Sequence, residues 1–379
     1  MASLYLHIPY CEKKCVYCDF YSIENMQTME LFLQSLETEI SLYADRYASA
    51  ESFETIFLGG GTPSLLPPSV LGHLLDTLRG RFRVENGAEI TVETNPGTVD
   101  RAKLRSYREL GVNRLSIGIQ SFHEEELRFL SRIHTADEAR RCVGDAYDAG
   151  FDNVSIDLIF ALPQQTTARW KENMEEGLRL GPKHISAYGL IVEEHTPLFT
   201  MVKEGAVKTA SEETDSRMYE ETMAFMEGHG YGHYEISNYA LPGYECRHNK
   251  NYWNHSNYLG FGPSAHSFWK ESSSGGYRWW NARSISQYCE NLSAGKLPVA
   301  GTEGIDQAKM IHEEIFLGLR TGVLDSNLLR RIYGIDLLSN RGRAVRQFSD
   351  EGLLRVEGET LHLTPKGFLF CDAIAESLL

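Results

Sequence analysis

Roughly the first 200 residues alternate between short apolar runs and amphipathic segments, and this alternation constrains the fold more than any other feature of the chain. The apolar runs are Leu4 to Ile8, Thr55 to Leu58, Ile90 to Val92, Leu115 to Ile119, Val154 to Phe160 and Ile185 to Val192. The segments between them show helical spacing, namely Glu30 to Tyr47, Val70 to Arg81, Ala102 to Leu110 and Arg169 to Leu180. Short apolar runs are typical of strands that are buried on both faces. Six strand–helix units in series therefore predict a parallel sheet, with right-handed crossovers that place the helices on one side.

Polar and glycine residues lie at or just after the ends of these predicted strands. They are Gly59-Gly60-Gly61-Thr62, Glu93, Gln120 and Asp157. Such residues converge on one site when parallel strands curve around a common axis. Six units are fewer than the eight of a closed barrel, so we expect an α/β fold built on a partial, three-quarter (βα)6 barrel.

The alternation stops near residue 205, and we expect three regions: the barrel at 1–205, an extension at 206–304 and a C-terminal domain at 305–379. Aromatic, His and Asn residues become dense between Gly230 and Trp269. The last region has two or three helical segments, then Gly352 to Val356, a turn and Leu361 to Leu363. Helices followed by a small hairpin resemble a winged helix, which on so acidic a chain favours a packing or lid module over DNA binding.

Composition limits the classes of partner. Residues of hydrophobic type make up 42% and charged residues 23%, which is typical of a globular protein, and the formal net charge is −15. Because nucleic-acid binding depends on neutralising phosphates with basic residues, we expect no nucleic-acid partner. No stretch of about 18 uncharged apolar residues and no signal-peptide pattern occurs, so we expect a cytoplasmic protein without a transmembrane segment.

Three of the seven cysteines, Cys11, Cys15 and Cys18, lie within eight residues directly after the first predicted strand. Soft thiolates in such a cluster bind iron–sulfur clusters or zinc. A structural zinc site needs four protein ligands, and a second CxxC pair is absent, although His7 could complete such a site. Three ligands leave one iron of a 4Fe-4S cluster open to a small molecule.

The CxxxCxxC spacing, with an aromatic residue just before the third cysteine, resembles the signature of the radical S-adenosylmethionine (SAM) superfamily. The resemblance implies that Cys11, Cys15 and Cys18 bind a 4Fe-4S cluster whose open iron holds SAM, and that an electron cleaves SAM to a 5′-deoxyadenosyl radical. It also implies a set of SAM-binding residues: Tyr5, Tyr17, Gly60, Gly61, Thr62, Glu93, Gln120, Arg132 and Asp157. Taken singly, Glu93 could cap a strand, Arg132 could form a surface ion pair and the glycines could form a plain turn. Their occurrence at successive strand ends favours one shared site.

Within the superfamily the chain is similar to the branch of the oxygen-independent coproporphyrinogen III oxidases and their haem-chaperone relatives. The similar segments cover nearly the whole chain and include HIPYCEKKCVYCDF, FLGGGTPS, ETNPG, SIGIQSF and SIDLIFALPQQT. Two departures separate it from the oxidases. Phe20 stands where the oxidases carry a fourth cysteine, and the ten residues before Cys11 cannot form the long arm that precedes the triplet in the oxidases. Porphyrinogen decarboxylation is therefore the alternative function, and enzyme activity stays open.

The segment Arg247 to Trp253 contains HNxxYW, the mark of the haem-chaperone relatives. Neutral imidazole is a good axial ligand for haem iron, and aromatic rings pack on a porphyrin face. We expect His248 to bind haem iron and Tyr252 and Trp253 to form the wall. Cys246 is a further candidate for ligation or covalent attachment, and His233, His255 and His266 are alternatives. Without the resemblance, a polar histidine satisfied inside the barrel would be the simpler interpretation.

Together these features predict a haem chaperone that binds a 4Fe-4S cluster, SAM and haem, and that delivers haem to an acceptor protein. A respiratory, membrane-associated haem protein is one candidate acceptor, and an electron donor is a second partner. Whether SAM is cleaved or serves as a structural or gating ligand stays open. Radical modification of an RNA or of a small metabolite is a third, less favoured function.

Overall fold

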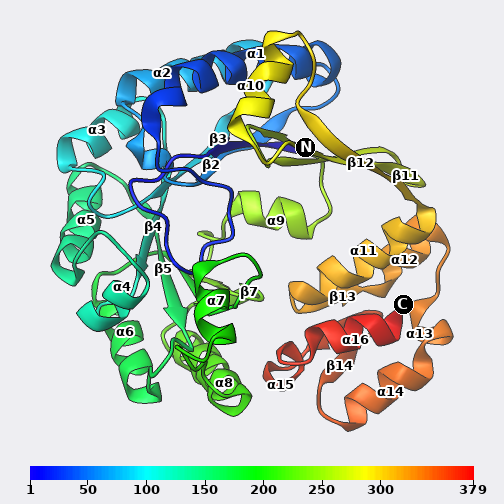
Figure 1. Cartoon of the computed structure of the whole chain (residues 1–379). Coiled ribbons are helices and arrows are strands. Elements are labelled where there is room, and N and C mark those ends of the chain that lie inside the picture. Colours follow the sequence, from blue (N-terminus) through cyan, green and yellow to red (C-terminus); the bar gives the residue numbers. More distant parts are fainter.

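Six parallel strands form a curved wall in the computed structural model, which describes residues 1–379 (Figure 1). They lie in sequence order as β1 (Ala2–Ile8), β2 (Phe53–Gly60), β3 (Val84–Thr94), β4 (Arg114–Gln120), β5 (Asn153–Phe160) and β6 (His184–Gly189). The wall curves around a central space and leaves one side open (Figure 1). The prediction of a partial α/β barrel is confirmed.

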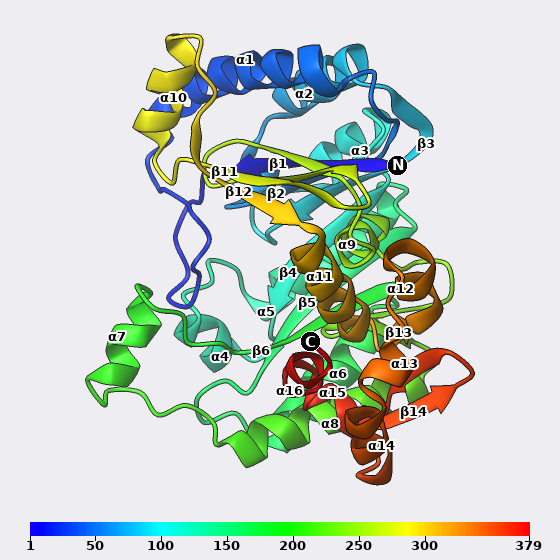
Figure 2. The same cartoon turned by 90° about the vertical axis from the view of Figure 1, so that its right-hand side faces the viewer.

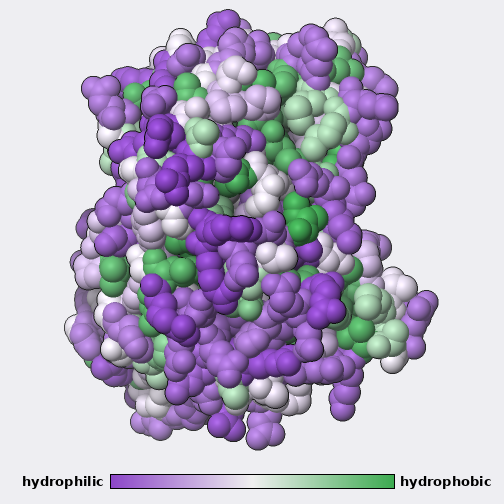
Figure 3. All heavy atoms as spheres, turned by 90° about the vertical axis from the view of Figure 1, so that its left-hand side faces the viewer, coloured by the Kyte–Doolittle hydropathy of each residue, from purple (hydrophilic) through white to green (hydrophobic).

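Helices cover the outer face of this wall (Figure 1). They are α1 (Met29–Tyr47), α2 (Pro68–Arg81), α3 (Arg101–Glu109), α4 (Glu124–Phe129), α5 (Ala136–Asp148) and α6 (Thr167–Arg179). Local sequence sets their starts: at α5, Thr135 Oγ1 accepts from Glu138 N at 3.2 Å while Glu138 Oε2 accepts from Thr135 N at 2.8 Å. Hydrophilic residues dominate the solvent side of these helices (Figure 3).

Side chains alternate between the two faces of the six strands, as the pleat of a sheet requires. Outward-facing residues are apolar and pack against the helices; in the first two strands they are Leu4, Leu6, Ile8, Ile56 and Leu58. Inward-facing residues are mostly polar and include Tyr5, His7, Glu93, Ser116 and Asp157. Burial of apolar residues on both faces, which the sequence predicts, is therefore found on the outer face only. The inner face lines a polar interior.

Both edges of the barrel sheet are extended by the middle of the chain. β7 (Gly232–Glu235) and β8 (Asn238–Ala240) follow β6, and β9 (Tyr258–Phe261) pairs in parallel with β1. Antiparallel β10 (His266–Ser272), β11 (Gly275–Asn281) and β12 (Val299–Asp306) continue the sheet to twelve strands. The predicted strand Ile185 to Val192 ends at Gly189, and the chain leaves the sheet toward α7 (Pro197–Lys203).

Helices α8 (Glu212–Gly228), α9 (Arg247–Trp253) and α10 (Ile285–Ser293) belong to the same middle stretch. α8 contacts α6 and β6, and α10 contacts α1, so both add to the outer helical layer. α9 differs because it lies inside the curve of the sheet and contacts β1 and β2 (Figure 1). The HNxxYW segment is therefore enclosed by the barrel rather than exposed at its surface.

The C-terminal region has its own sheet and its own core (Figure 2). The strands lie in the order β13 (Val323–Asp325), β15 (Thr360–Leu363) and β14 (Leu354–Glu357). The helices are α11 (Gln307–Arg320), α12 (Ser326–Tyr333), α13 (Leu337–Asn340), α14 (Gly342–Asp350), α15 (Pro365–Phe368) and α16 (Cys371–Leu378). Helices with a small antiparallel sheet agree with the winged-helix-like prediction, which had missed β13. No helix of the structure has both the length and the apolar character needed to cross a bilayer.

Candidate functional site

The cysteine loop begins at the carboxyl end of β1, and backbone hydrogen bonds close its base. Cys11 N donates to Ile23 O at 3.0 Å, and Ile23 N donates to Pro9 O at 2.7 Å. Within the loop, Cys18 N donates to Cys15 O at 3.2 Å. Cys11 is buried, Cys15 and Cys18 are half-buried, and all three are free thiols. The loop thus holds three available sulfurs at the carboxyl edge of the parallel sheet.

The glycines after β2 are required by close packing against this loop. Gly61 N donates to Ile8 O at 2.8 Å, and Thr62 N donates to Tyr10 O at 2.7 Å. A Cβ on Gly61 would lie 2.6 Å from Tyr10 O, so a side chain at this position would push the cysteine loop away. Thr62 Oγ1 reaches Cys11 Sγ at 3.5 Å. The glycine segment therefore fixes the position of the cysteine loop.

Glu93 and Asp157 place two carboxyl groups on the inner face of the barrel. Gly60 N donates to Glu93 Oε2 at 3.1 Å, and Ser116 Oγ donates to Asp157 Oδ1 at 3.1 Å. Burial and the negative charge of Asp157 raise the pKa of Glu93 to about 8. Burial also raises the pKa of Asp157, although the hydroxyl of Ser186 opposes the shift. A cation bound here would restore the ionised form of Glu93.

Arg132 connects the cysteine loop to the end of β4. Its Nη2 donates to Gly118 O at 2.6 Å, and its Nη1 lies 3.5 Å from Cys15 Sγ. Its Nε is buried without a partner, so one donor remains for a ligand. Gln120, at the end of β4, has φ +69°, and a Cβ on Gly118 would lie 2.9 Å from its Nε2. A left-handed backbone at a non-glycine residue is strained, and such strain concentrates at functional sites.

Tyr17 belongs to the cysteine loop, and Tyr5 of β1 is linked to the loop through His7. The Tyr5 hydroxyl lies 3.2 Å from Nδ1 of His7, and His7 Nε2 lies 2.7 Å from Tyr21 O. Burial raises the pKa of Tyr5 well above its ordinary value. Tyr17 packs against a small apolar cluster that contains Leu130. The role of both tyrosines in packing against SAM stays a prediction.

The cysteine loop suits a 4Fe-4S cluster better than a zinc ion. Burial raises the pKa of Cys18 to about 11 and also raises that of Cys11, so their thiolates need a bound cation at neutral pH. A single zinc ion needs its ligands gathered around one point, and no three His, Cys, Asp or Glu side chains are so gathered. His7 could not complete a zinc site without losing a contact, because Tyr5 and Tyr21 occupy both its ring nitrogens. In a cubane cluster, each thiolate binds a different iron.

His248 lies inside the barrel at the amino-terminal ends of β1 and β2. Its Nδ1 is 2.7 Å from Thr55 Oγ1, and its Nε2 is 2.9 Å from the Tyr252 hydroxyl. The ring stacks on Phe57, with 4.9 Å between the centroids. Burial, followed by the charge of Arg114, lowers the pKa of His248 to about 3, so the imidazole is neutral. Ligation of haem iron would require one of these two hydrogen bonds to open.

Glu89 holds α9 in this position. Its carboxylate accepts from His248 N at 3.1 Å and from Arg247 N at 3.2 Å, which satisfies the amino end of the helix. Cys246 Sγ is buried 3.5 Å from the same carboxylate. At the other end of the helix, the Trp253 Nε1 is buried without a partner. The three predicted haem-site residues thus share one short helix.

The other candidate histidines lie apart from His248. His255 bridges Glu313 at 2.8 Å and Glu314 at 3.2 Å, which ties the end of α9 to α11. His233 stacks on Tyr239 with 4.5 Å between the centroids. His266 is exposed, and it lies on the inner face of the sheet in β10. The structure therefore does not gather these histidines into one site.

Two families of known proteins match this chain. The Radical SAM superfamily matches residues 5–176, and the HemN C-terminal domain matches residues 305–370. Heme chaperone HemW of Bacillus subtilis is 33% identical over 383 residues, which cover 100% of this chain and 99% of that protein. The chain belongs to the HemW family of radical SAM proteins. HemW of Escherichia coli is 39% identical over 272 residues, which cover 70% of the chain and 69% of that protein.

The fold of this HemW-family chain is shared with coproporphyrinogen III oxidase (HemN) from Escherichia coli. The two structures superpose with a TM-score of 0.85 at 24% identity, covering 100% of this chain and 89% of that one. Phe20 occupies the position at which we expect the oxidases to carry a fourth cysteine. Its side chain is 65% exposed.

Sequence reasoning missed three residues that organise the site in this HemW-family chain, and it considered His7 only as a zinc ligand. His7 links Tyr5 to the cysteine loop, Glu89 caps α9, and Arg114 is a fully buried cation. Arg283 Nη2 donates to Asp19 Oδ1 at 2.7 Å and holds the cysteine loop from outside. A charged residue at the start of an apolar strand, such as Arg114, was the one signal in the sequence that could have been used.

Proposed function

We propose that this chain is a haem chaperone that holds a 4Fe-4S cluster through Cys11, Cys15 and Cys18, SAM at that cluster, and haem on the HNxxYW segment. Relatives named heme chaperone HemW match it over the full chain, which supports the proposal. Delivery of the haem to an acceptor protein is part of the proposal. A respiratory, membrane-associated haem protein is the candidate acceptor.

The observation that carries the proposal is that the cysteine loop and α9 lie at opposite ends of the same strands. The cysteine loop follows the carboxyl end of β1, and α9 lies against the amino ends of β1 and β2. Tyr5 lies between them: its hydroxyl is 3.2 Å from His7, and its ring centroid is 6.4 Å from that of His248. A change at one end therefore has a short packed path to the other.

The residues around the cysteine loop have distinct tasks in this proposal. Thr62 and Arg132 donate to sulfur, which stabilises the thiolate charge on Cys11 and Cys15. Glu93 offers a carboxylate to a cationic ligand group, and Arg132 Nε offers a donor to an anionic one. Gln120, Asp157, Gly60, Gly61, Tyr5 and Tyr17 complete the proposed SAM-binding set. When bound, the reduced cluster and SAM together supply one-electron cleavage of the sulfonium, unless SAM serves as a gating ligand only.

The haem end of the proposal depends on a rearrangement of side chains on α9. His248 is neutral and can bind iron, but both its ring nitrogens are engaged, to Thr55 and Tyr252. We propose that the bond to Tyr252 opens, since both partners lie on the same short helix. The rings of Tyr252 and Trp253 then form the wall against the porphyrin. The cluster thiolates also need a reducing compartment and an electron donor, so we propose a cytoplasmic protein.

A haem-transfer experiment tests this function. Anaerobically reconstituted protein is loaded with haemin, separated from free haem and mixed with a haem-free acceptor protein. The acceptor's Soret band should grow as the band of the chain falls. The same protein with SAM, reductant and coproporphyrinogen III should release no carbon dioxide. Release of 5′-deoxyadenosine and carbon dioxide in step with porphyrin turnover, without haem transfer, would instead make the chain an oxidase.

A further inference from the structure

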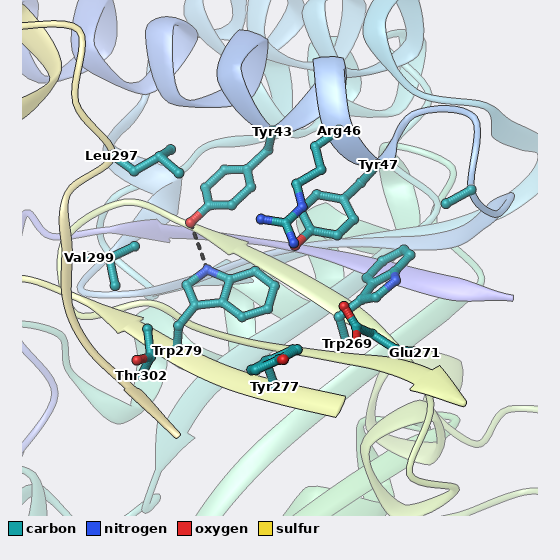
Figure 4. Close-up of a pocket in the computed structure, with 11 residues that line it drawn as sticks. Tyr43, Arg46, Tyr47, Trp269, Glu271, Tyr277, Trp279, Leu297, Val299 and Thr302 are labelled. Carbon is teal, nitrogen blue, oxygen red and sulfur yellow. Dashed lines mark hydrogen bonds between the residues drawn. The ribbon is translucent and has the colours of Figure 1, made fainter. Parts of the chain in front are cut away.

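A cavity lies on the outer side of the part of the sheet formed by β10, β11 and β12, away from the cysteine loop. It has a volume of about 550 Å³ and is bounded by the last turns of α1 and by the outer face of β10, β11 and β12 (Figure 4). This volume lies within the range of about 300–1,000 Å³ that is typical of small-molecule sites. Nothing in the proposed cluster, SAM or haem sites makes use of it.

Aromatic rings form the walls of this outer pocket. The rings of Tyr47 and Trp279 are nearly parallel, with 5.9 Å between centroids and 16° between planes, and Tyr47 and Trp269 lie 4.6 Å apart. Trp279 Nε1 donates to the Tyr43 hydroxyl at 2.6 Å, which fixes the indole (Figure 4). Tyr277, which is 48% exposed, forms an outer wall. A rigid aromatic lining of this kind favours a flat, conjugated ligand.

One cation stands at the rim of the outer pocket. Arg46 is exposed, and its guanidinium carbon lies 5.2 Å from the centroid of the Tyr47 ring. Arg46 forms no ion pair, since no carboxylate lies within 4.0 Å of its guanidinium nitrogens, although Glu271 also lines the pocket. On a chain with net charge −15, a free arginine beside aromatic rings is complementary to a ligand carboxylate.

The sheet separates this pocket from His248. Trp279 faces the pocket, whereas its neighbours Arg278 and Trp280 face the inner side, where Trp280 stacks on His266. No His, Cys or Met lines the pocket, so tyrosine is the only common axial ligand for haem iron that it contains. Burial raises the pKa of Tyr43 and of Tyr47, which keeps both phenols neutral and makes them poor iron ligands. A ligand in the outer pocket would therefore be held chiefly by its ring and its carboxylates.

We propose that the outer pocket is a second porphyrin site, in which the macrocycle packs against Tyr277 and the small exposed parts of Trp279 and Trp269, and a propionate pairs with Arg46. The choice of porphyrin rests on the proposed haem-chaperone function, which supplies a flat dicarboxylate as cargo. The pocket and the His248 site differ in one property that can be measured. The outer pocket recognises the porphyrin with or without its metal, whereas the His248 site requires iron.

The test is a titration of the anaerobically reconstituted protein with metal-free protoporphyrin IX, followed by quenching of tryptophan fluorescence. Thr302→Phe fills the pocket, because Thr302 is exposed on edge strand β12 directly opposite Trp279. Arg46→Gln removes the cation without touching the core. The matched controls are Val323→Phe, at an exposed position on another edge strand, and Arg105→Gln, on the exposed face of α3. Circular dichroism and iron content verify that each variant folds.

The expected result is saturable binding of protoporphyrin that weakens more than tenfold in Thr302→Phe and about fivefold in Arg46→Gln, with both controls unchanged. The dimethyl ester of protoporphyrin should bind wild type and Arg46→Gln equally. Equal protoporphyrin binding by wild type and Thr302→Phe would overturn the outer site, as would no binding at all. Haemin binding that depends on His248 would survive either result, so the two proposals fail separately.

Discussion

Nη1 of Arg132 lies 3.5 Å from Sγ of Cys15, although the two residues are 117 positions apart in the chain. The same guanidinium donates through Nη2 to Gly118 O at 2.6 Å, so the end of β4 fixes its direction. A positive charge is thereby held against one of the three thiolates proposed to bind the cluster. Hydrogen bonds and charge near the sulfurs are among the factors that set the reduction potential of an iron–sulfur cluster.

Replacing Arg132 by Met should lower the reduction potential of the reconstituted cluster, because the lost charge stabilises the reduced, more negative form. A hydrogen bond to a charged group is worth about 1.5–3 kcal/mol, and about 59 mV corresponds to a tenfold change for one electron. We therefore expect a shift of at most about 130 mV. A redox titration followed by electron paramagnetic resonance measures it. The reduction potential of Arg132→Lys should lie between those of wild type and Arg132→Met. The control Arg105→Met should leave the potential unchanged. An unchanged potential in Arg132→Met would show that the guanidinium does not act on the cluster.

Each of the substitutions Cys11→Ala, Cys15→Ala and Cys18→Ala should remove the cluster, because a cubane held by three thiolates does not tolerate the loss of one. Iron should fall from about four atoms per chain to less than one, together with the broad visible absorption. Cys142→Ala is the matched control, since Cys142 is a buried free thiol in α5 outside the loop. Equal iron loss in the control would mean that the metal is bound elsewhere.

Glu93→Gln should change how the stability of the SAM-free protein depends on pH. The pKa of Glu93 is about 8 in the folded chain against about 4.3 in an unfolded one, so folding takes up a proton between these values. Its contribution to stability is therefore fully present below pH 4.3 and is lost as the pH rises through 8. Gln stays neutral at every pH. The free energy of unfolding of the variant should therefore rise relative to that of wild type by at most about 1.4 kcal/mol per pH unit across this window. Urea unfolding at pH 5.5, 7 and 8.5 measures the difference.

A constant difference between Glu93→Gln and wild type over that range would show that Glu93 is ionised in the folded chain. Glu109→Gln serves as the control because Glu109 is exposed at the end of α3. Its unfolding free energy should follow that of wild type at all three pH values.

Tyr252→Phe should strengthen haem binding and lower the free energy of unfolding. The hydroxyl lies 2.9 Å from His248 Nε2, so its removal frees the nitrogen proposed to bind iron. Without the hydroxyl, His248 Nε2 is buried and unsatisfied, which should lower the free energy of unfolding by about 1–3 kcal/mol. The haem affinity should rise about fivefold. Haemin titration and urea unfolding measure the two effects. Tyr239→Phe is the control, because the Tyr239 hydroxyl is buried without a partner. Weaker haem binding by Tyr252→Phe would show that iron is not bound at Nε2.

The barrel was predictable because its strands and helices are encoded locally. The polar residues after the strands, such as Glu93 and Gln120, identified the carboxyl edge of the sheet, since parallel strands bring their ends together. The contact between Arg132 and Cys15 depends on the registers of β1 and β4, which no local pattern encodes. The engagement of both His248 nitrogens likewise depends on Thr55, 193 residues away. The same holds for the outer pocket, whose walls come from α1 and from strands more than 200 residues later.

The central claim is that haem binds at α9, and an anaerobic haemin titration of wild type and His248→Ala tests it most directly. Both proteins are reconstituted with the cluster, and the Soret band is followed to saturation. The account predicts an iron-dependent component in wild type that disappears in His248→Ala, while iron content and circular dichroism stay the same. Superimposable titrations of the two proteins would contradict it and would remove His248 from the haem site.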